Sequence, residues 1–145
     1  MRNEHNQSAI PSRILYTMIR VSDLDRSVAF YRDALGMTEL RRENFTAGRF
    51  TLVFIGYGDG MSRAVIELTY NWDENYYALG TAYGHIALNV SDIYAACKRL
   101  KDMGVKIVRP PAPMTYAVDE TGHKEDIAFI EDPDGYKIEL IKENQ

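Results

Sequence analysis

Two stretches of the chain repeat one pattern, and this repeat limits the folds that the chain can adopt. Residues 16–36 read YTMIRVSDLDRSVAFYRDALG, and residues 85–104 read HIALNVSDIYAACKRLKDMG. Both stretches pass from an apolar segment into Val-Ser-Asp and then into apolar residues at helical spacing, before they end at a glycine. Self-similarity of this kind indicates a chain that is built from two copies of one structural unit.

Each repeat predicts one helix with recognisable ends. The candidates for the N-cap are Ser22 or Asp23 in the first repeat and Ser91 or Asp92 in the second. Their side-chain oxygens can accept the first free backbone N–H groups of a helix. Gly36 and Gly104 suit the left-handed position that follows a last helical turn. We therefore expect a helix between the cap and the glycine in each half.

Extended segments follow each expected helix, separated by polar or glycine-rich stretches. The expected strands are Thr38–Arg41, Phe50–Ile55 and Ala64–Tyr70 in the first half, and Val105–Val108, Ile127–Glu131 and Tyr136–Ile141 in the second. Asp-Pro-Asp-Gly at 132–135 predicts a tight turn between the last two strands. The prediction is an α+β fold of two βαβββ modules. Because one module leaves a sheet face uncovered, two or more must pack together.

Length and composition favour one globular domain. The 145 residues are 46% hydrophobic and 26% charged, which is ordinary for a soluble protein. We expect a flexible tail over residues 1–12 and one domain over 13–143, with modules at about 13–75 and 80–143. The formal charge of −4 gives no basic stripe for nucleic acid or an anionic membrane surface. No apolar run approaches the ~18 residues of a membrane span.

The start of the chain and its cysteine content indicate a compartment. The first residues are polar and contain no apolar signal region, so we expect no secretory signal. Cys97 is the single cysteine and cannot form a disulfide within the chain. This pattern fits a reducing compartment, and a cytoplasmic location is expected.

The repeat also pairs four polar positions on the expected strands. Tyr16 and His85 each lie five residues before the valine of Val-Ser-Asp, while Glu67 and Glu139 lie near the ends of the last strands of their halves. One interpretation is that the glutamates face solvent and His85 is a hydrogen-bonded core histidine. The other is that these groups face one cavity and supply oxygen and nitrogen ligands to a divalent transition metal.

Four stretches of the sequence resemble a known family, and they follow one another over nearly the whole chain. They are TMIRVSDLDRSVAFYRDALGM, AVIELTYNW, LGTAYGHIAL and EDPDGYKIELI. From about Ile14 to Glu143, the chain resembles glyoxalase I (lactoylglutathione lyase) of the vicinal oxygen chelate superfamily. The resemblance implies paired βαβββ modules and a homodimer whose active sites lie between subunits.

The resemblance also implies a metal site and a reaction. Glu67, His85 and Glu139 match metal ligands, and nickel or zinc is expected, with cobalt as a further candidate. The substrate would be the hemithioacetal that forms from glutathione and methylglyoxal, and the product would be S-lactoylglutathione. Glu139 matches the base that moves a proton between neighbouring carbons, with Glu67 second, while the metal holds the enediolate oxygens.

Two further residues match positions that bind glutathione in the family. Arg20 would pair its guanidinium with a carboxylate of the substrate, and a structural salt bridge is the alternative. Asn71 would contact the glutathione part of the substrate, and a plain turn role is the alternative.

Two departures from the family bear on function. Tyr16 stands where familiar members have His or Gln, and a phenol must lose a proton to bind a metal well. The metal would then be held by three protein ligands plus water, or ligated by Tyr16 with a changed metal preference. The remaining alternative is a catalytically impaired or redirected protein that binds a glutathione conjugate or another small molecule. The segment over residues 109–126 is also longer than expected, and it would alter thiol selectivity or form a solvated excursion.

Overall fold

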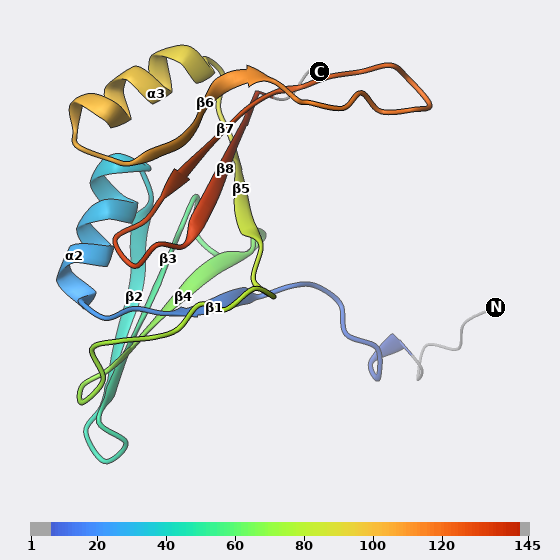
Figure 1. The fold of residues 1–145 in the computed structure, drawn as a ribbon. Coiled ribbons are helices and arrows are strands. Elements are labelled where there is room, and N and C mark those ends of the chain that lie inside the picture. The colour runs from blue at the N-terminus through green and yellow to red at the C-terminus, as the bar shows by residue number, and fades with distance from the viewer. Residues whose placement is uncertain (1–6, 143–145) are drawn as a thin grey trace.

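Two four-stranded sheets, each with one helix on a single face, make up the protein (Figure 1). The computed structural model describes residues 7–142. The first six residues of the expected tail, and the expected domain end at 143, lie outside the described residues. Among the described residues, no helix is long and apolar enough to span a membrane.

The first module has the expected βαβββ order. Its elements are β1 (Tyr16–Arg20), α2 (Leu24–Ala29) with its continuation η1 (Phe30–Ala34), β2 (Thr38–Phe45), β3 (Phe50–Gly56) and β4 (Val65–Asn71). The strand order across the sheet is β1-β4-β3-β2. Strand β1 runs parallel to β4, and the other pairs are antiparallel.

The second module repeats this arrangement. Its elements are β5 (His85–Asn89), α3 (Ile93–Asp102), β6 (Ile107–Pro113), β7 (Asp126–Glu131) and β8 (Lys137–Lys142). The strand order is β5-β8-β7-β6, which places each strand as its counterpart is placed in the first sheet. The expected α+β fold of two βαβββ modules is therefore confirmed.

The helix ends follow the local chemistry of the repeat. The carboxylate of Asp23 accepts a hydrogen bond from the Arg26 N–H, and that of Asp92 accepts one from the Ala95 N–H. Gly36 and Gly104 both have positive φ angles, of 73° and 85°, which residues other than glycine adopt at a cost.

The first helix departs from expectation in its second half. The segment Phe30–Ala34 is a π-helix and not a continuation of the α-helix. Arg99 of α3 donates hydrogen bonds to the carbonyl oxygens of Asp33 and Ala34, and the Tyr57 hydroxyl donates to that of Leu35. Side chains from other elements therefore satisfy the carbonyls at the end of this wider turn, which the sequence pattern does not reveal.

Both helices lie on the same side of the molecule, and one core lies between them and the sheets (Figure 1). Fully buried core residues come from both modules, among them Val21, Tyr31 and Leu68 from the first, and Ile130 and Leu140 from the second. The modules therefore pack together within one chain. The sheet faces turned away from the helices, here called the open faces, hold the polar positions that the repeat singles out.

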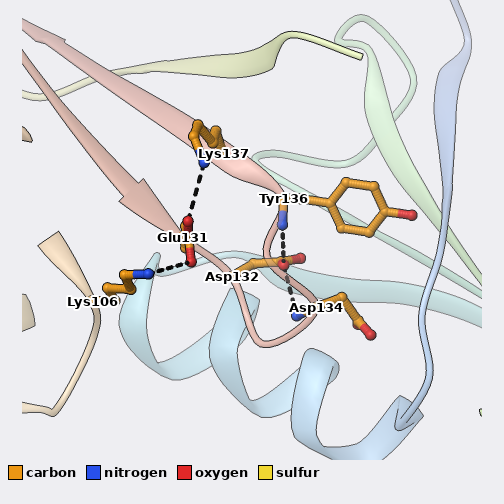
Figure 2. A network of polar contacts seen from close by, with 6 residues as sticks. All are labelled: Lys106, Glu131, Asp132, Asp134, Tyr136 and Lys137. Carbon is orange, nitrogen blue, oxygen red and sulfur yellow. Dashed lines mark hydrogen bonds and ion pairs between the residues drawn. The ribbon is translucent and has the colours of Figure 1, made fainter. Parts of the chain in front are cut away.

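A polar junction ties the first helix to the turn between β7 and β8. The Tyr31 hydroxyl donates a 2.6 Å hydrogen bond to the buried carboxylate of Asp132. The same carboxylate accepts the backbone N–H groups of Asp134 and Tyr136, as Figure 2 shows. Burial raises the pKa of Asp132, and these three hydrogen bonds act in the opposite direction.

The same junction extends to β1 and to the surface. The hydroxyl of Tyr136 donates to the backbone carbonyl of Arg20 at a distance of 2.8 Å. Next to it, Glu131 pairs with Lys106 and Lys137 at 3.3 and 3.1 Å (Figure 2). The end of β1 and the start of β8 are thereby fixed to each other across the module boundary.

The long segment over residues 109–126 forms a hairpin that projects beyond the second sheet (Figure 1). Its first residues, with three prolines, lie within the edge strand β6, where a missing backbone N–H is tolerated. Beyond β6, the Met114 N–H donates to Glu125 O and the Val118 N–H donates to His123 O. Tyr116 near the tip is 83% exposed.

Candidate active site

One half of the candidate site lies on the open face of the first sheet. Glu67 on β4 stands directly between Met18 of β1 and Phe54 of β3 in the strand register. The ring of Tyr16 meets the ring of Phe54 edge-on, with the ring centres 5.1 Å apart. Glu67 is only 9% exposed. Its burial raises the pKa of the carboxyl, whereas the positive charge of Arg41 lowers it.

The other half lies on the open face of the second sheet. His85 Nε2 is 3.2 Å from Glu139 Oε1, and the side chains are 40% and 15% exposed. The imidazole also packs edge-on against Phe129, whose ring centre is 5.1 Å away. The exposure of His85 contradicts the alternative of a core histidine. The positions of Glu67 and Glu139 likewise contradict the alternative that both face solvent freely.

The two halves match residue by residue. In the first sheet, Glu67 pairs with Phe54, which pairs with Arg41 on β2. In the second sheet the corresponding partners are Glu139, Phe129 and Arg109. Tyr16 and His85 precede these rows at the same position on β1 and β5. The repeat in sequence is therefore a repeat of two half-sites in space.

The phenylalanine and the arginine of each row were not predicted from the sequence. The signal was present in the repeat, because Arg41 and Arg109 each lie on the first strand after the helix of their module. It could not be used without the strand register, which aligns the arginine with the glutamate two strands away.

The structure does not bring the expected ligands together within one chain. Over residues 7–142, no group of three or more His, Cys, Asp or Glu side chains lies close enough to hold a metal ion. His85 and Glu139 are adjacent, but Glu67 and Tyr16 lie on the other sheet. Each chain therefore presents two separate half-sites.

The donor atoms that are present fit a divalent transition metal. Two ligands that are each about 2.1 Å from a metal, at 90–110° to each other, lie roughly 3.0–3.4 Å apart. The 3.2 Å between His85 Nε2 and Glu139 Oε1 agrees with this spacing. Imidazole nitrogen and carboxylate oxygen are also common ligands of such ions.

The two expected substrate-binding residues lie near the Glu67 half-site. Arg20, at the end of β1, shares the open face with Tyr16 and Met18, since strand side chains alternate. Within the part of the chain that the structure describes, its guanidinium forms no ion pair, so the salt-bridge alternative finds no support. Asn71, at the end of β4, donates a 3.0 Å hydrogen bond to the Tyr77 hydroxyl. Its amide thus also anchors the loop that follows.

Residues 13–140 match the family model of the Glyoxalase/Bleomycin resistance protein/Dioxygenase superfamily. The chain belongs to this superfamily. It is 54% identical over 129 residues to a probable lactoylglutathione lyase of Synechocystis, covering 89% of this chain and 94% of the relative. It is 52% identical over 130 residues to a lactoylglutathione lyase of Neisseria meningitidis serogroup A, covering 90% of both chains.

Solved structures of glyoxalase I share the superfamily fold seen here. Glyoxalase I from Zea mays superposes with a TM-score of 0.83 at 37% identity, covering 92% of this chain. This chain spans only 45% of the maize protein. The trypanothione-dependent glyoxalase I of Leishmania major superposes with a TM-score of 0.76 at 44% identity, covering 91% of this chain and 87% of that one.

Proposed function

We propose that the protein is a metal-dependent lactoylglutathione lyase that converts the hemithioacetal of glutathione and methylglyoxal to S-lactoylglutathione. One observation carries the proposal. A chain about half identical to lactoylglutathione lyases places Glu67 and Glu139 at equivalent positions of its two sheets, with His85 3.2 Å from Glu139. A catalytically impaired binder is not favoured, because close relatives over most of the chain are named as lyases.

The complete site would form between two copies of the chain. Glu67 lies apart from His85 and Glu139 within one chain, and each open face carries one half-site. In a symmetric dimer, the first module of one copy would face the second module of the other, and two equal sites would result. The maize chain, about twice as long as this one, has room for two such units.

A divalent metal, nickel or zinc, with cobalt as a further candidate, would act when bound as a Lewis acid for the developing enediolate. Glu67, His85 and Glu139 would hold it, and Tyr16 would not serve as a ligand. Three protein ligands leave coordination positions for water and substrate, as in other catalytic sites.

The proton transfer would be the work of the glutamates. Glu139 would take the proton from the carbon that carries sulfur and return it to the neighbouring carbon, so that no net proton is gained or lost. Glu67, buried beside Phe54, would be the second candidate for this shuttle. Arg20 and Asn71 would bind the glutathione part.

The buried state of the single cysteine, Cys97, is consistent with a cytoplasmic location, which stays a prediction.

The test is an assay of purified protein loaded separately with nickel, zinc or cobalt. Methylglyoxal and glutathione are premixed, and formation of the S-lactoylglutathione thioester is followed by its ultraviolet absorbance. We expect turnover with at least one metal and none for Glu139→Gln, with its folding checked by circular dichroism. No thioester with any metal would overturn the proposal.

A further inference from the structure

Arg41 places its positive charge on the open face of the first sheet, and the N–H groups of its guanidinium make no hydrogen bond to the described residues. Its guanidinium carbon lies 3.9 Å from the centre of the Phe54 ring. Stacking of this kind uses the flat face of the guanidinium and leaves the N–H groups at its rim available. The side chain is 59% exposed, so solvent and small molecules can reach it.

The matching arginine of the second sheet is used differently. Arg109 donates hydrogen bonds to the carbonyl oxygens of Ala112, Pro113 and Ile127, which tie the irregular strand β6 to β7. Arg41 donates no hydrogen bond to any residue in the described range 7–142. Its one ion-pair partner there is Glu43, at 3.4 Å from Nε, and its charge also acts on Glu67. Two residues at equivalent positions therefore differ, because one supports the fold and the other presents an open cation.

Arg41 lies on the same sheet face as the Glu67 half-site of the candidate active site. Arg41, Phe54 and Glu67 lie in one row on three adjacent strands, so Arg41 stands two strand spacings, about 10 Å, from the glutamate. A planar cation with free, coplanar donors suits a carboxylate, which can accept two parallel hydrogen bonds. A substrate that reaches Glu67 and extends toward β2 would meet this cation.

We propose that Arg41 is a substrate-binding residue that takes a carboxylate of the substrate. The role rests on the proposed function above. The carboxylate belongs either to glutathione itself or to the substituent that the aldehyde adds to sulfur, and the chemistry of recognition is the same for both. The pairing replaces the loose contact with Glu43 and holds the reacting carbons beside Glu67.

Unreactive ligands separate these sources in a calorimetric titration of the metal-loaded protein. The ligands are S-methylglutathione, its ethyl ester at the glycyl carboxylate, and S-carboxymethylglutathione. The variant is Arg41→Gln, which removes the charge from an exposed side chain. Arg42→Gln is the matched control, because Arg42 is the next residue on β2, points to the other face and pairs with Glu39.

We expect Arg41→Gln to weaken binding roughly tenfold for the ligand whose carboxylate it contacts, as charged hydrogen bonds commonly do. If Arg41→Gln binds S-methylglutathione more weakly than wild type but binds the ester equally well, Arg41 contacts the glycyl carboxylate. If Arg41→Gln also binds the ester more weakly than wild type, Arg41 contacts the γ-glutamyl carboxylate. If only the affinity for S-carboxymethylglutathione is reduced, Arg41 contacts the carboxylate of the substituent on sulfur.

Two results would overturn the role of Arg41, and they differ from failure of the proposed function. The first is equal affinity of Arg41→Gln and Arg42→Gln for all three ligands. The second is a wild-type advantage over Arg41→Gln that does not shrink with added salt, since a partly exposed ion pair is screened. If wild-type protein binds none of these ligands, the proposed function itself fails.

Discussion

The phenol ring of Tyr16 and the imidazole ring of His85 occupy equivalent positions in the two modules. Each lies at the start of a first strand, and each meets a phenylalanine ring edge-on with the ring centres 5.1 Å apart. The position at the start of the first strand, beside a phenylalanine ring, can therefore hold either a phenol or an imidazole ring. The modules differ in the atom that this ring presents to the site, a hydroxyl in one and a nitrogen in the other.

We expect Tyr16→His to raise metal affinity. The imidazole would stand on Phe54 as His85 stands on Phe129, and it would add a neutral nitrogen donor to the site. A gain of roughly tenfold or more is expected, since even indirect changes around a metal alter affinity 10–100-fold. Competition with a chromophoric chelator measures it. Tyr16→Phe, which keeps the ring contact, should bind metal as wild type does, and equal affinity of all three proteins would contradict the prediction.

Mixing two inactive variants should restore activity if the site forms between chains. Glu67→Gln damages the half-site of the first module, and Glu139→Gln damages that of the second. In a mixed dimer, one site would receive both substitutions and the other neither. After unfolding and refolding together in equal amounts, about a quarter of the wild-type activity is expected. Activity no higher than in the separately refolded variants would place each site within one chain.

Asp132 should contribute strongly to stability through its hydrogen bonds. Asp132→Ala leaves the Tyr31 hydroxyl and two backbone N–H groups without their acceptor. We expect a loss of about 3 kcal/mol in the free energy of unfolding, measured by urea titration. Asp132→Asn keeps an oxygen for the N–H groups and should lose much less. A similar loss for both variants would contradict this account of the junction.

The same residue predicts a pH dependence with a definite sign. Burial raises the pKa of Asp132 in the folded state above the ordinary aspartate value of about 3.9. The folded protein therefore holds this proton more tightly than the unfolded chain. Its contribution to stability is complete below the unfolded pKa and is lost as pH rises through the folded pKa. The stability of Asp132→Asn relative to wild type should accordingly increase as the pH rises above the ordinary aspartate pKa of about 3.9, as urea titrations at several pH values would reveal.

Arg49 combines a strained backbone with a well-made ion pair. It is the non-glycine residue with positive φ among those described, at 58°, and its side chain contacts both carboxylate oxygens of Asp73 at 2.7 and 2.8 Å. Arg49→Ala keeps the strain and loses the pair, whereas Arg49→Gly loses the pair but adopts this φ freely. We expect Arg49→Gly to unfold at a midpoint roughly 3 °C above that of Arg49→Ala. The reverse order in thermal scans would exclude backbone strain at this position.

Much of the fold follows from the repeat alone. The spacing of apolar residues, the aspartate caps and the two glycines predicted the helices, and the βαβββ order followed from the strands behind them. These features depend on residues near one another in sequence. The π-helix at Phe30–Ala34 was not predicted, because the groups that satisfy its end come from Arg99 and Tyr57, far along the chain.

The candidate site was predictable as a set of residues but not as an arrangement. Glu67, His85 and Glu139 were identified by their equivalent positions and by the family resemblance. Their division between two sheets depends on how the modules pack, which local patterns do not specify. The different uses of Arg41 and Arg109 also escaped prediction, because they depend on the irregular register of β6, where backbone carbonyls turn toward Arg109.

The structure of the hairpin between β6 and β7 bears on how the length of the protein can change in evolution. Beyond Pro113 its backbone hydrogen bonds run between its own two arms, as those from Met114 to Glu125 and from Val118 to His123 show. Each doubling of such a loop costs only about 0.6 kcal/mol in closure entropy. Insertions and deletions should therefore accumulate here first, and descendants of this gene can vary in length at the hairpin while the shared core stays intact.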